Sequence, residues 1–167
     1  MEVRRLRRTE QALFKDLRLR ALADSPDAFA QTLADAESQP DSYWDRLTHS
    51  VTEPDGQVMF VAEDGVRPVG LVFGLLDPQH PRVGRVGGMW VAPEARDRRA
   101  GQALLDAVVA WAQERGLGTL ELWVTEGNSP AARLYRRAGF VETGARDVLP
   151  ANPMLSTVQM ALQLGRG

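Results

Sequence analysis

Residues 58–91 contain three strand-like segments in succession, and this run most limits what the chain can fold into. Residues 58–62 and 69–76 are mostly apolar and are separated by the turn-forming residues 64–68, so they predict a hairpin. The third segment, residues 83–91, carries three glycines, which predict a bulge or a close backbone approach. These patterns place a β-sheet at the centre of the fold.

Helical and strand-like patterns flank this sheet on both sides. Strands are expected at residues 2–7, 117–125, 140–148 and 156–164, and helices after residue 9, from residue 40, at 99–115 and at 129–138, with a weaker helical pattern at 27–36. The order β-α-α-β-β-β-α-β-α-β-β predicts an α+β or α/β fold with a mixed sheet. The chain has 167 residues, so we expect a single domain that spans residues 1–167.

Composition excludes several classes of function. The 44% apolar and 25% charged residues are typical of a soluble globular protein, and the net charge of −2 argues against a basic nucleic-acid binder. There is no cysteine, and His49 and His80 stand alone, so neither a thiol nucleophile nor a metal site is expected. Because no stretch approaches 18 apolar residues, we expect a cytoplasmic protein without a membrane span.

Residues 89–105 combine a strand, a proline-broken turn, a basic cluster and the start of a helix. A helix N-terminus leaves amide N–H groups unpaired and carries a positive partial charge, so it can bind a phosphate. Arg96, Arg98 and Arg99 add cations, and the segment predicts a diphosphate-bearing cofactor. The alternative is a surface turn with solvated arginines, because 19 of the 20 basic residues are arginine, as in chains with GC-rich codon usage.

Residues 128–140 form a second candidate motif after a strand. Asn128 or Ser129 can cap a helix, Pro130 suits its first turn, and Gly139 ends it. Tyr135 lies two turns beyond Asn128 on the same face, so both side chains can face one groove. A lone tyrosine on a helix is also compatible with a position in the core.

The first motif resembles the hallmark of the GNAT superfamily of acetyl-CoA-dependent N-acetyltransferases. The residues that match in register are Val91, Pro93, Arg96, Gly101 and Leu104. Asp97 and Arg99 stand where the family has glycines. We expect the amides of residues 98–102 to face the cofactor without these glycines, provided that Arg99 does not need a positive φ. A second register, Arg98-x-x-Gly101-x-Ala103, displaces the loop by two residues, so the register anchored on Val91 and Pro93 is preferred.

The second motif resembles the other cofactor motif of the same superfamily. Together with the preceding strands, which also fit, the two motifs cover roughly residues 57–141. The resemblance implies a mixed, mostly antiparallel sheet flanked by helices. It implies acetyl-CoA as the acetyl donor, no metal, and a primary amine of a small molecule or peptide as the acceptor. No nucleic acid or membrane partner is expected, and dimerisation through edge strands is common in the family.

The resemblance also implies site residues. The expected cofactor contacts are Met89, Trp90, Val91, Arg96, Arg98, Arg99, Ala100, Gly101, Gln102, Ala103, Asn128, Ala131 and Tyr135. Backbone N–H groups near Val91 would face the thioester carbonyl, and Tyr135 would donate a proton to the thiolate of coenzyme A. The amine would attack directly, without a covalent intermediate on the enzyme.

The general base is not marked by a motif. Glu121 shares one side of its strand with Trp123, whereas Glu126 points to the other face, so Glu121 is the better candidate. A solvated carboxylate at Glu121 and a chain of water molecules as the base are the alternatives. If the chain has no general base, it is a non-catalytic acyl-CoA-binding sensor or interaction domain. The presence of Arg99 where the family has glycine also favours this alternative.

The acceptor site is expected among the early helices and the loop before the last strand. Residues 24–55 contain eight acids against the single base Arg46. This concentration of acids either attracts a cationic amine or belongs to solvated surface helices. Phe29 and Trp44 are candidate pocket walls and equally candidate core residues.

Overall fold

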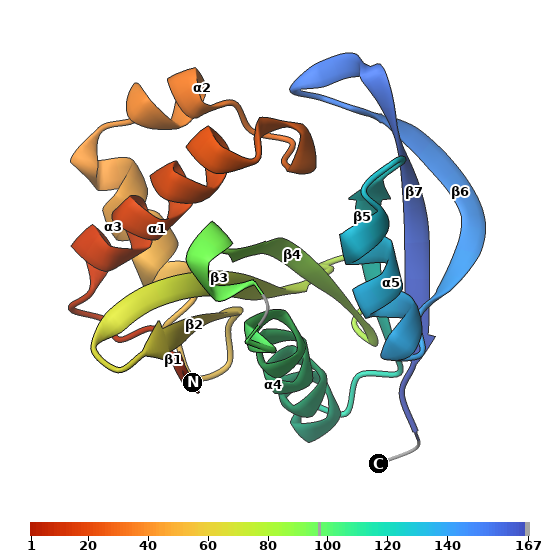
Figure 1. The fold of residues 1–167 in the computed structure, drawn as a ribbon. Helices are drawn as coiled ribbons and strands as arrows, with labels where there is room; N and C mark the ends of the chain where they lie inside the picture. The colour runs from red at the N-terminus through yellow and green to blue at the C-terminus, as the bar shows by residue number, and fades with distance from the viewer. Residues whose placement is uncertain (97, 166–167) are drawn as a thin grey trace.

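The computed structural model describes residues 1–96 and 98–165, in which seven strands form one sheet of order β1-β2-β3-β4-β5-β7-β6 (Figure 1). The strands are β1 (Glu2–Arg5), β2 (Val58–Asp64), β3 (Arg67–Leu76), β4 (Val83–Val91), β5 (Thr119–Thr125), β6 (Val141–Leu149) and β7 (Asn152–Gln163). Neighbouring strands are antiparallel except for β4 and β5, which are parallel. The prediction of a mixed, mostly antiparallel sheet is confirmed.

Helices cover both faces of the sheet, with α4 on one face and α1 and α3 on the other (Figure 1). The helices are α1 (Gln11–Asp24), α2 (Leu33–Glu37), α3 (Asp41–Ser50), α4 (Ala100–Glu114) and α5 (Ser129–Arg137), with 3-10 turns η1 (Pro26–Ala28) and η2 (Pro93–Ala95). The weaker helical pattern at 27–36, which the predicted order does not count, corresponds to η1 and the short helix α2, whose start is capped by the Thr32 side chain. Within the described ranges, no helix is long and apolar enough to span a membrane.

Strands β4 and β5 separate soon after they begin. They pair only at residues 83–85 of β4 and 119–121 of β5. Beyond this point β4 continues along β3, whereas β5 continues along β7. Because both strands run in the same direction, their diverging carboxyl ends open the middle of the sheet and lead to the starts of α4 and α5.

Strand β4 contains the bulge that its glycines predicted. Phe73 pairs with Gly87 and Leu71 with Trp90, so β4 has one residue more than β3 over this interval. Gly88 adopts φ 61°, and a Cβ at this position would stand 2.4 Å from Cδ2 of Phe73. Only glycine therefore fits, and the bulge lies beside the point where the sheet opens.

Packing of α4 fixes the direction of its N-terminus. Leu104, Leu105, Val108 and Trp111 are buried, and each contributes roughly 1.5–3 kcal/mol by removal from water. Trp111 lies so close to the sheet that a Cβ at Gly74 would stand 2.8 Å from its ring. The start of α4 is thereby held at the end of β4.

Candidate active site

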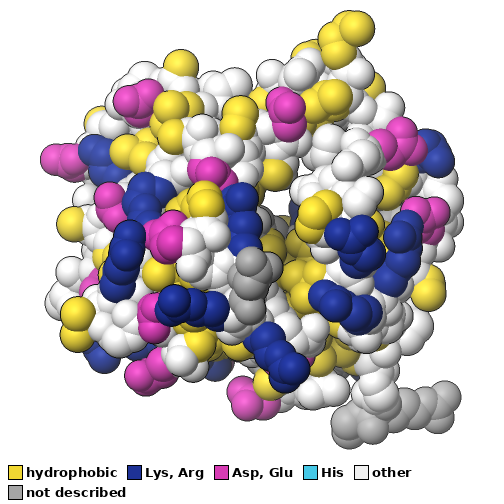
Figure 2. Space-filling model, in the orientation of Figure 1, with side chains coloured by type: hydrophobic (Ala, Val, Ile, Leu, Met, Phe, Trp, Pro, Cys, Tyr) yellow, Lys and Arg dark blue, Asp and Glu magenta, His cyan; other side chains and the backbone are white. Residues whose placement is uncertain are grey.

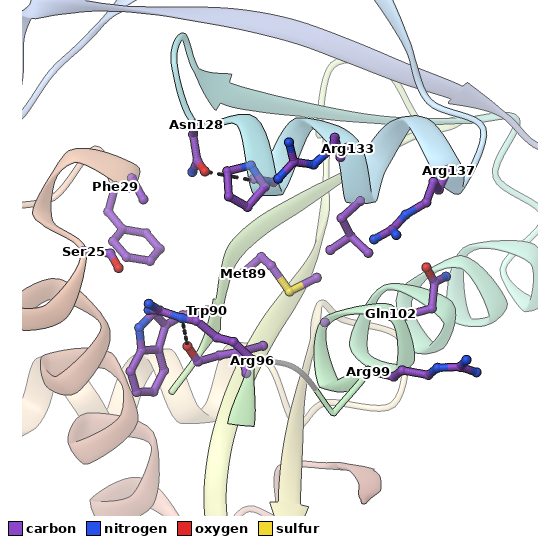
Figure 3. A pocket seen from close by; sticks show the side chains of 16 residues that line it. Ser25, Phe29, Met89, Trp90, Arg96, Arg99, Gln102, Asn128, Arg133 and Arg137 are labelled. Atoms are coloured by element: carbon purple, nitrogen blue, oxygen red, sulfur yellow. Dashed lines mark hydrogen bonds between the residues drawn. The ribbon is translucent and has the colours of Figure 1, made fainter. Parts of the chain in front are cut away.

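A large cleft lies between the end of β4, the start of α4 and α5 (Figure 3). Its volume is about 1020 Å³. The lining residues are Ser25, Ala28, Phe29, Met89, Trp90, Val91, Arg96, Arg99, Gly101, Gln102, Asn128, Pro130, Ala131, Arg133, Leu134 and Arg137. We call this space the main cleft. Figure 2 shows it as a hollow with apolar side chains inside and basic side chains on its rims.

The N-terminus of α4 offers unpaired amides to the main cleft. The first backbone bond within this helix start runs from the Ala103 N–H to the Arg99 carbonyl, at 3.0 Å. Among the described residues, the N–H groups of residues 100–102 have no acceptor, and the Arg99 side chain does not cap them. At Gly101 a Cβ would stand 3.2 Å from Leu134 of α5, so the two helices approach closely here. This helix end can bind a diphosphate.

Arg99 adopts the left-handed conformation, with φ 61° and ψ 19°. Among the described residues, it alone has a positive φ without being glycine. The condition attached to the sequence prediction, that Arg99 does not need a positive φ, is therefore not met. Arg99 stands at a place where the family has glycine, the residue that adopts this conformation without steric cost. Asp97, at the other such place, lies outside the described residues.

Two arginines of the loop before α4 are engaged by acids. Arg96 pairs with Asp24 at the end of α1, and its Nε donates to the Val91 carbonyl at 3.1 Å. Arg98 pairs with Asp64 at the end of β2 and does not line the main cleft. Both pairs tie the loop to the rest of the fold, and only Arg96 remains at the cleft wall.

Asp24 connects this loop to β4. Its carboxylate accepts hydrogen bonds from Nε1 of Trp90 at 2.9 Å and from the Ser25 hydroxyl at 2.7 Å, in addition to the Arg96 pair. The Trp90 hydrogen bond is the main cause that lowers the pKa of Asp24 below its ordinary value, followed by Ser25 and Arg96. An ionised Asp24 thus holds Trp90 and Arg96 in place.

Helix α5 forms the opposite wall. Its predicted cap is confirmed, because the Asn128 side chain accepts from the Ala131 N–H at 3.4 Å. Arg133 and Arg137 line the main cleft, are exposed, and have no carboxylate partner within residues 1–96 and 98–165. Reasoning from the sequence missed both arginines, although their spacing of four residues places them on one helical face.

A smaller cavity of about 90 Å³ lies where β4 and β5 separate. We call it the strand-split cavity. Its walls are Ala28, Phe29, Val86, Gly87, Gly88, Met89, Trp123, Val124, Thr125, Asn128, Ala131, Leu134 and Tyr135. The prediction that Asn128 and Tyr135 face one groove is confirmed. Six of these residues also line the main cleft, so the two spaces adjoin.

Tyr135 is buried at the wall of the strand-split cavity. Burial raises its pKa to about 12. Its ring packs against Phe140 with centroids 5.9 Å apart, and its hydroxyl has no hydrogen-bond partner among the residues that the structure describes. The hydroxyl is therefore protonated at neutral pH and available as a donor.

Glu121 lies on the same face of β5 as Trp123 but lines none of the cavities. Its carboxylate accepts a hydrogen bond from Nε2 of Gln159 at 3.1 Å. Glu126 pairs with Arg146 instead. A role of Glu121 as base in the strand-split cavity therefore requires an intervening water molecule.

A third cavity, of about 220 Å³, lies between α1, α3 and the bulge of β4. We call it the α1–α3 cavity. Its walls are Phe14, Arg18, Gln31, Tyr43, Trp44, Leu47, Ser50, Val51, Gln57, Phe73, Leu75, Gly87 and Gly88. Gly87 and Gly88 also line the strand-split cavity. The three spaces thus form a series from the start of α4 to the opposite face of the sheet.

The acids of residues 24–55 do not line the α1–α3 cavity. Asp45 lies beside His49, Glu53 pairs with Arg8, and Asp24 holds Trp90 and Arg96. Of the two aromatic residues weighed as walls, Trp44 lines this cavity and Phe29 lines the other two. Within the described residues, no group of three or more potential acidic or histidine ligands could hold a metal ion.

Most of the predicted cofactor contacts meet at these cavities. Met89, Trp90, Val91, Arg96, Arg99, Gly101, Gln102, Asn128 and Ala131 line the main cleft, and Tyr135 lines the strand-split cavity. Arg98, Ala100 and Ala103 do not line them. Ala100 is fully buried, so only its backbone can serve the start of α4.

Several known proteins are similar to this chain. A mycothiol acetyltransferase from Pseudarthrobacter chlorophenolicus is 32% identical over 123 residues, which are 72% of this chain and 36% of that protein. A ribosomal-protein-alanine N-acetyltransferase from Brucella melitensis has the same fold, with a TM-score of 0.78 at 22% identity, over 98% of this chain and 100% of that one. A spermidine N-acetyltransferase from Vibrio cholerae, solved with CoA and spermine, gives a TM-score of 0.78 at 19% identity, over 99% and 96% of the two chains.

These similarities differ in extent. The chain spans 36% to 43% of the length of several curated mycothiol acetyltransferases that it matches, so those proteins contain further segments. The solved structures match nearly the whole chain at low identity and show the fold. The model of the acetyltransferase (GNAT) family matches residues 19–140. This range includes both motifs and all residues that line the main cleft and the strand-split cavity. The chain belongs to the GNAT acetyltransferase family.

Proposed function

We propose that residues 1–167 act as one N-acetyltransferase domain, which transfers the acetyl group of acetyl-CoA to a primary amine of a small molecule or peptide. The amine attacks the thioester directly. The series of three adjoining cavities carries this proposal, because it lets a donor and an acceptor enter from opposite faces of the sheet and meet where β4 and β5 separate.

The walls of the main cleft fit coenzyme A. The unpaired amides of α4 suit a diphosphate, and Arg99, Arg133 and Arg137 add positive charge around it. The narrow strand-split cavity, with small residues such as Gly87 and Ala131 at its walls, suits an extended chain that ends in a thioester. Bound acetyl-CoA would supply the carbonyl carbon that the amine attacks.

Backbone groups and Tyr135 would stabilise the charges of the reaction. The bulge at Gly88 and Met89 leaves backbone N–H groups outside regular pairing with β3, close to Val91, where they can face the thioester carbonyl. Tyr135 would give its proton to the departing thiolate, and burial keeps this proton in place until then. Glu121 would accept the amine proton through water.

The proposal is tested by blocking the passage between the cavities. Ala131 lines both the main cleft and the strand-split cavity, whereas its neighbour Ala132 lines neither. We expect Ala131→Leu to weaken acetyl-CoA binding, measured by calorimetry, by at least about tenfold, and to slow release of free thiol in the presence of an amine panel. Ala132→Leu is the matched control on the same helix. Equal behaviour of the two variants would contradict the proposed path.

A second candidate function is a non-catalytic acyl-CoA-binding sensor or interaction domain. It is favoured by one observation: among residues 1–96 and 98–165, no carboxylate or histidine lines any of the three cavities. The two candidates differ in a simple assay, because a sensor binds acetyl-CoA without releasing thiol when amines are added. The cytoplasmic location and dimerisation through edge strands stay predictions.

A further inference from the structure

Arg18 places a guanidinium at the inner end of the α1–α3 cavity. It follows Phe14 by four residues and precedes Leu22 by four, so it lies on the face of α1 that packs against the sheet. Its Nη1 lies 3.7 Å from the point where a Cβ at Gly88 would stand. Since Gly88 also lines the strand-split cavity, the charge is held where the two cavities adjoin.

The guanidinium is fixed on one edge and unused on the other. Oε1 of Gln31 accepts hydrogen bonds from Nε at 3.3 Å and from Nη2 at 3.2 Å. Gln31 is itself oriented, because its Nε2 donates to Asp35 at 2.9 Å and to the Tyr43 hydroxyl at 3.1 Å. Arginine has five N–H donors, so both on Nη1 and one on Nη2 remain. These form the end-on fork that binds a carboxylate through two parallel hydrogen bonds.

Within residues 1–96 and 98–165, no carboxylate forms an ion pair with Arg18. The ring of Phe29 lies 5.1 Å from its guanidinium carbon, and burial lowers the pKa of this guanidinium below its ordinary value. A second residue of the cavity wall, Trp44, has a buried indole N–H without an acceptor among the described residues. The walls of the α1–α3 cavity are thus rich in donors and lack a negative charge.

We propose that Arg18 binds a carboxylate of the acceptor, so that the acceptor is a small amine that also carries a carboxylate, as an α-amino acid does. This inference rests on the proposed acetyl transfer. One carbon separates the amine from the carboxylate in such a molecule, so a carboxylate on Arg18 leaves the amine beside Gly88, facing the strand-split cavity.

Size and wall chemistry agree with this acceptor class. The cavity of about 220 Å³ is smaller than the sites that hold drug-sized ligands. Phe14, Trp44 and Phe73 form an apolar side, which suits an apolar side chain on the acceptor. A polyamine would instead bring cations to a wall on which Arg18 is the one charged residue that the structure describes.

Matched amines test the inference on the wild-type protein. Leucine, leucinamide and isopentylamine share a side chain but differ in the carboxylate, as do phenylalanine, phenylalaninamide and phenethylamine. We expect kcat/KM for the amino acids to exceed that for the amides and amines by about 10- to 100-fold. The phosphonate analogue of leucine and spermidine complete the panel. Equal or better use of amides, phosphonate or spermidine overturns the inference.

Variants of Arg18 separate recognition from folding. We expect Arg18→Gln to raise KM for the amino acids about 10- to 100-fold and to leave the amides nearly unchanged, with Arg18→Lys between the two. Lys15→Gln removes the same charge from the same helix at a position that lines none of the cavities, and serves as control. Unchanged acetyl-CoA affinity in each variant shows that the fold is intact. A purely structural Arg18 would change stability without changing the preference.

The two proposals fail in different ways. If acetyl-CoA does not bind, the proposed function itself is wrong. If acetyl-CoA binds and amines are acetylated without a preference for carboxylates, only the inference on Arg18 is wrong. If acetyl-CoA binds but the amino acids are neither acetylated nor bound in calorimetry with coenzyme A present, the carboxylate acceptor is likewise excluded.

Discussion

The two walls of the main cleft use arginine in opposite ways. In the loop before α4, Arg96 at the cleft wall and Arg98 outside the cleft pair with Asp24 and Asp64. On the wall formed by α5, Arg133 and Arg137 line the cleft without acidic partners among the described residues. Both walls carry basic side chains (Figure 2), but only α5 carries two that are not already engaged.

This difference separates arginines that hold the loop before α4 in place from arginines that can bind an anion in the main cleft. In the loop, the paired arginines tie residues 96 and 98 to α1 and β2, beside the start of α4. On α5, the arginines are exposed, and they become useful when an anion approaches. The loop would thus act through its backbone and α5 through its side chains. Substitutions on the two walls should accordingly change different measured quantities.

The largest expected effect is on the rate and comes from α5. Tyr135→Phe removes the hydroxyl at the strand-split cavity while the ring stays against Phe140. Because loss of a general acid slows proton transfer in the transition state, we expect kcat to fall about 100-fold with KM for acetyl-CoA nearly unchanged. Steady-state kinetics on a confirmed amine measure both. A variant as active as the wild type would remove Tyr135 from the mechanism.

The next effect is on affinity. Replacing Arg133 and Arg137 together by Gln removes two cations from the cleft, and we expect the Kd of acetyl-CoA to rise about 30-fold, less so at high salt. Arg136→Gln is the control, because Arg136 lies on the same helix, pairs with Glu142 and does not line the main cleft. Calorimetry at two salt concentrations measures the change.

The same experiment decides the role of Arg98. The sequence pattern predicts that Arg98 binds the cofactor, whereas its pair with Asp64 holds it away from the walls of the main cleft. We expect Arg98→Gln to change the Kd of acetyl-CoA less than about threefold. A rise as large as that of the α5 double variant would show that both walls bind through their side chains.

The contrast also marks what could be predicted from the sequence. The cap at Asn128 and the shared face of Asn128 and Tyr135 follow from local rules of helix geometry, and the structure confirms them. Arg133 and Arg137 were missed because, in a chain with 19 arginines, an exposed pair looks like a solvated surface. Whether α5 turns that pair toward the cleft depends on the separation of β4 and β5, which only the assembled sheet shows.

Arg18 teaches the converse lesson. Its position among Phe14, Leu17, Ala21 and Leu22 places it on the apolar face of α1, and this is a signal that the sequence contains. What Arg18 binds could not be predicted, because its neighbours Phe29, Gln31 and Gly88 come from other parts of the chain. These neighbours decide which of its N–H donors stay available. Tertiary contacts, rather than helical period, decide what a buried charge can bind.

On the loop wall, stability should change more than affinity. Asp24→Asn removes the charge that Trp90 and Arg96 share, and we expect the free energy of unfolding at pH 7 to fall by about 1–2 kcal/mol in urea. The pKa of Asp24 is lower in the folded than in the unfolded chain. Its contribution to the free energy of unfolding is therefore present above the pKa of the unfolded chain and is lost as pH falls through the pKa of the folded chain. The difference between wild type and variant should therefore shrink below about pH 4. A difference that stays constant into acid would show that charge is not involved.

The smallest effect concerns Arg99, whose backbone shapes the loop before α4 and whose side chain can bind the cofactor. Its backbone is left-handed, which costs an arginine roughly 1 kcal/mol more than a glycine, and its side chain lines the main cleft. Arg99→Gly removes the strain and the cation, whereas Arg99→Ala removes the cation and keeps the strain. We expect the free energy of unfolding in urea to be about 1 kcal/mol higher for Arg99→Gly than for Arg99→Ala. Both variants should bind acetyl-CoA about threefold more weakly than the wild type. If Arg99→Gly instead bound acetyl-CoA more tightly than the wild type, the backbone conformation at residue 99 would contribute more to affinity than the charge of its side chain. The loop would then act through its backbone even at this residue. Equal stability of the two variants would show that the positive φ is not maintained in solution.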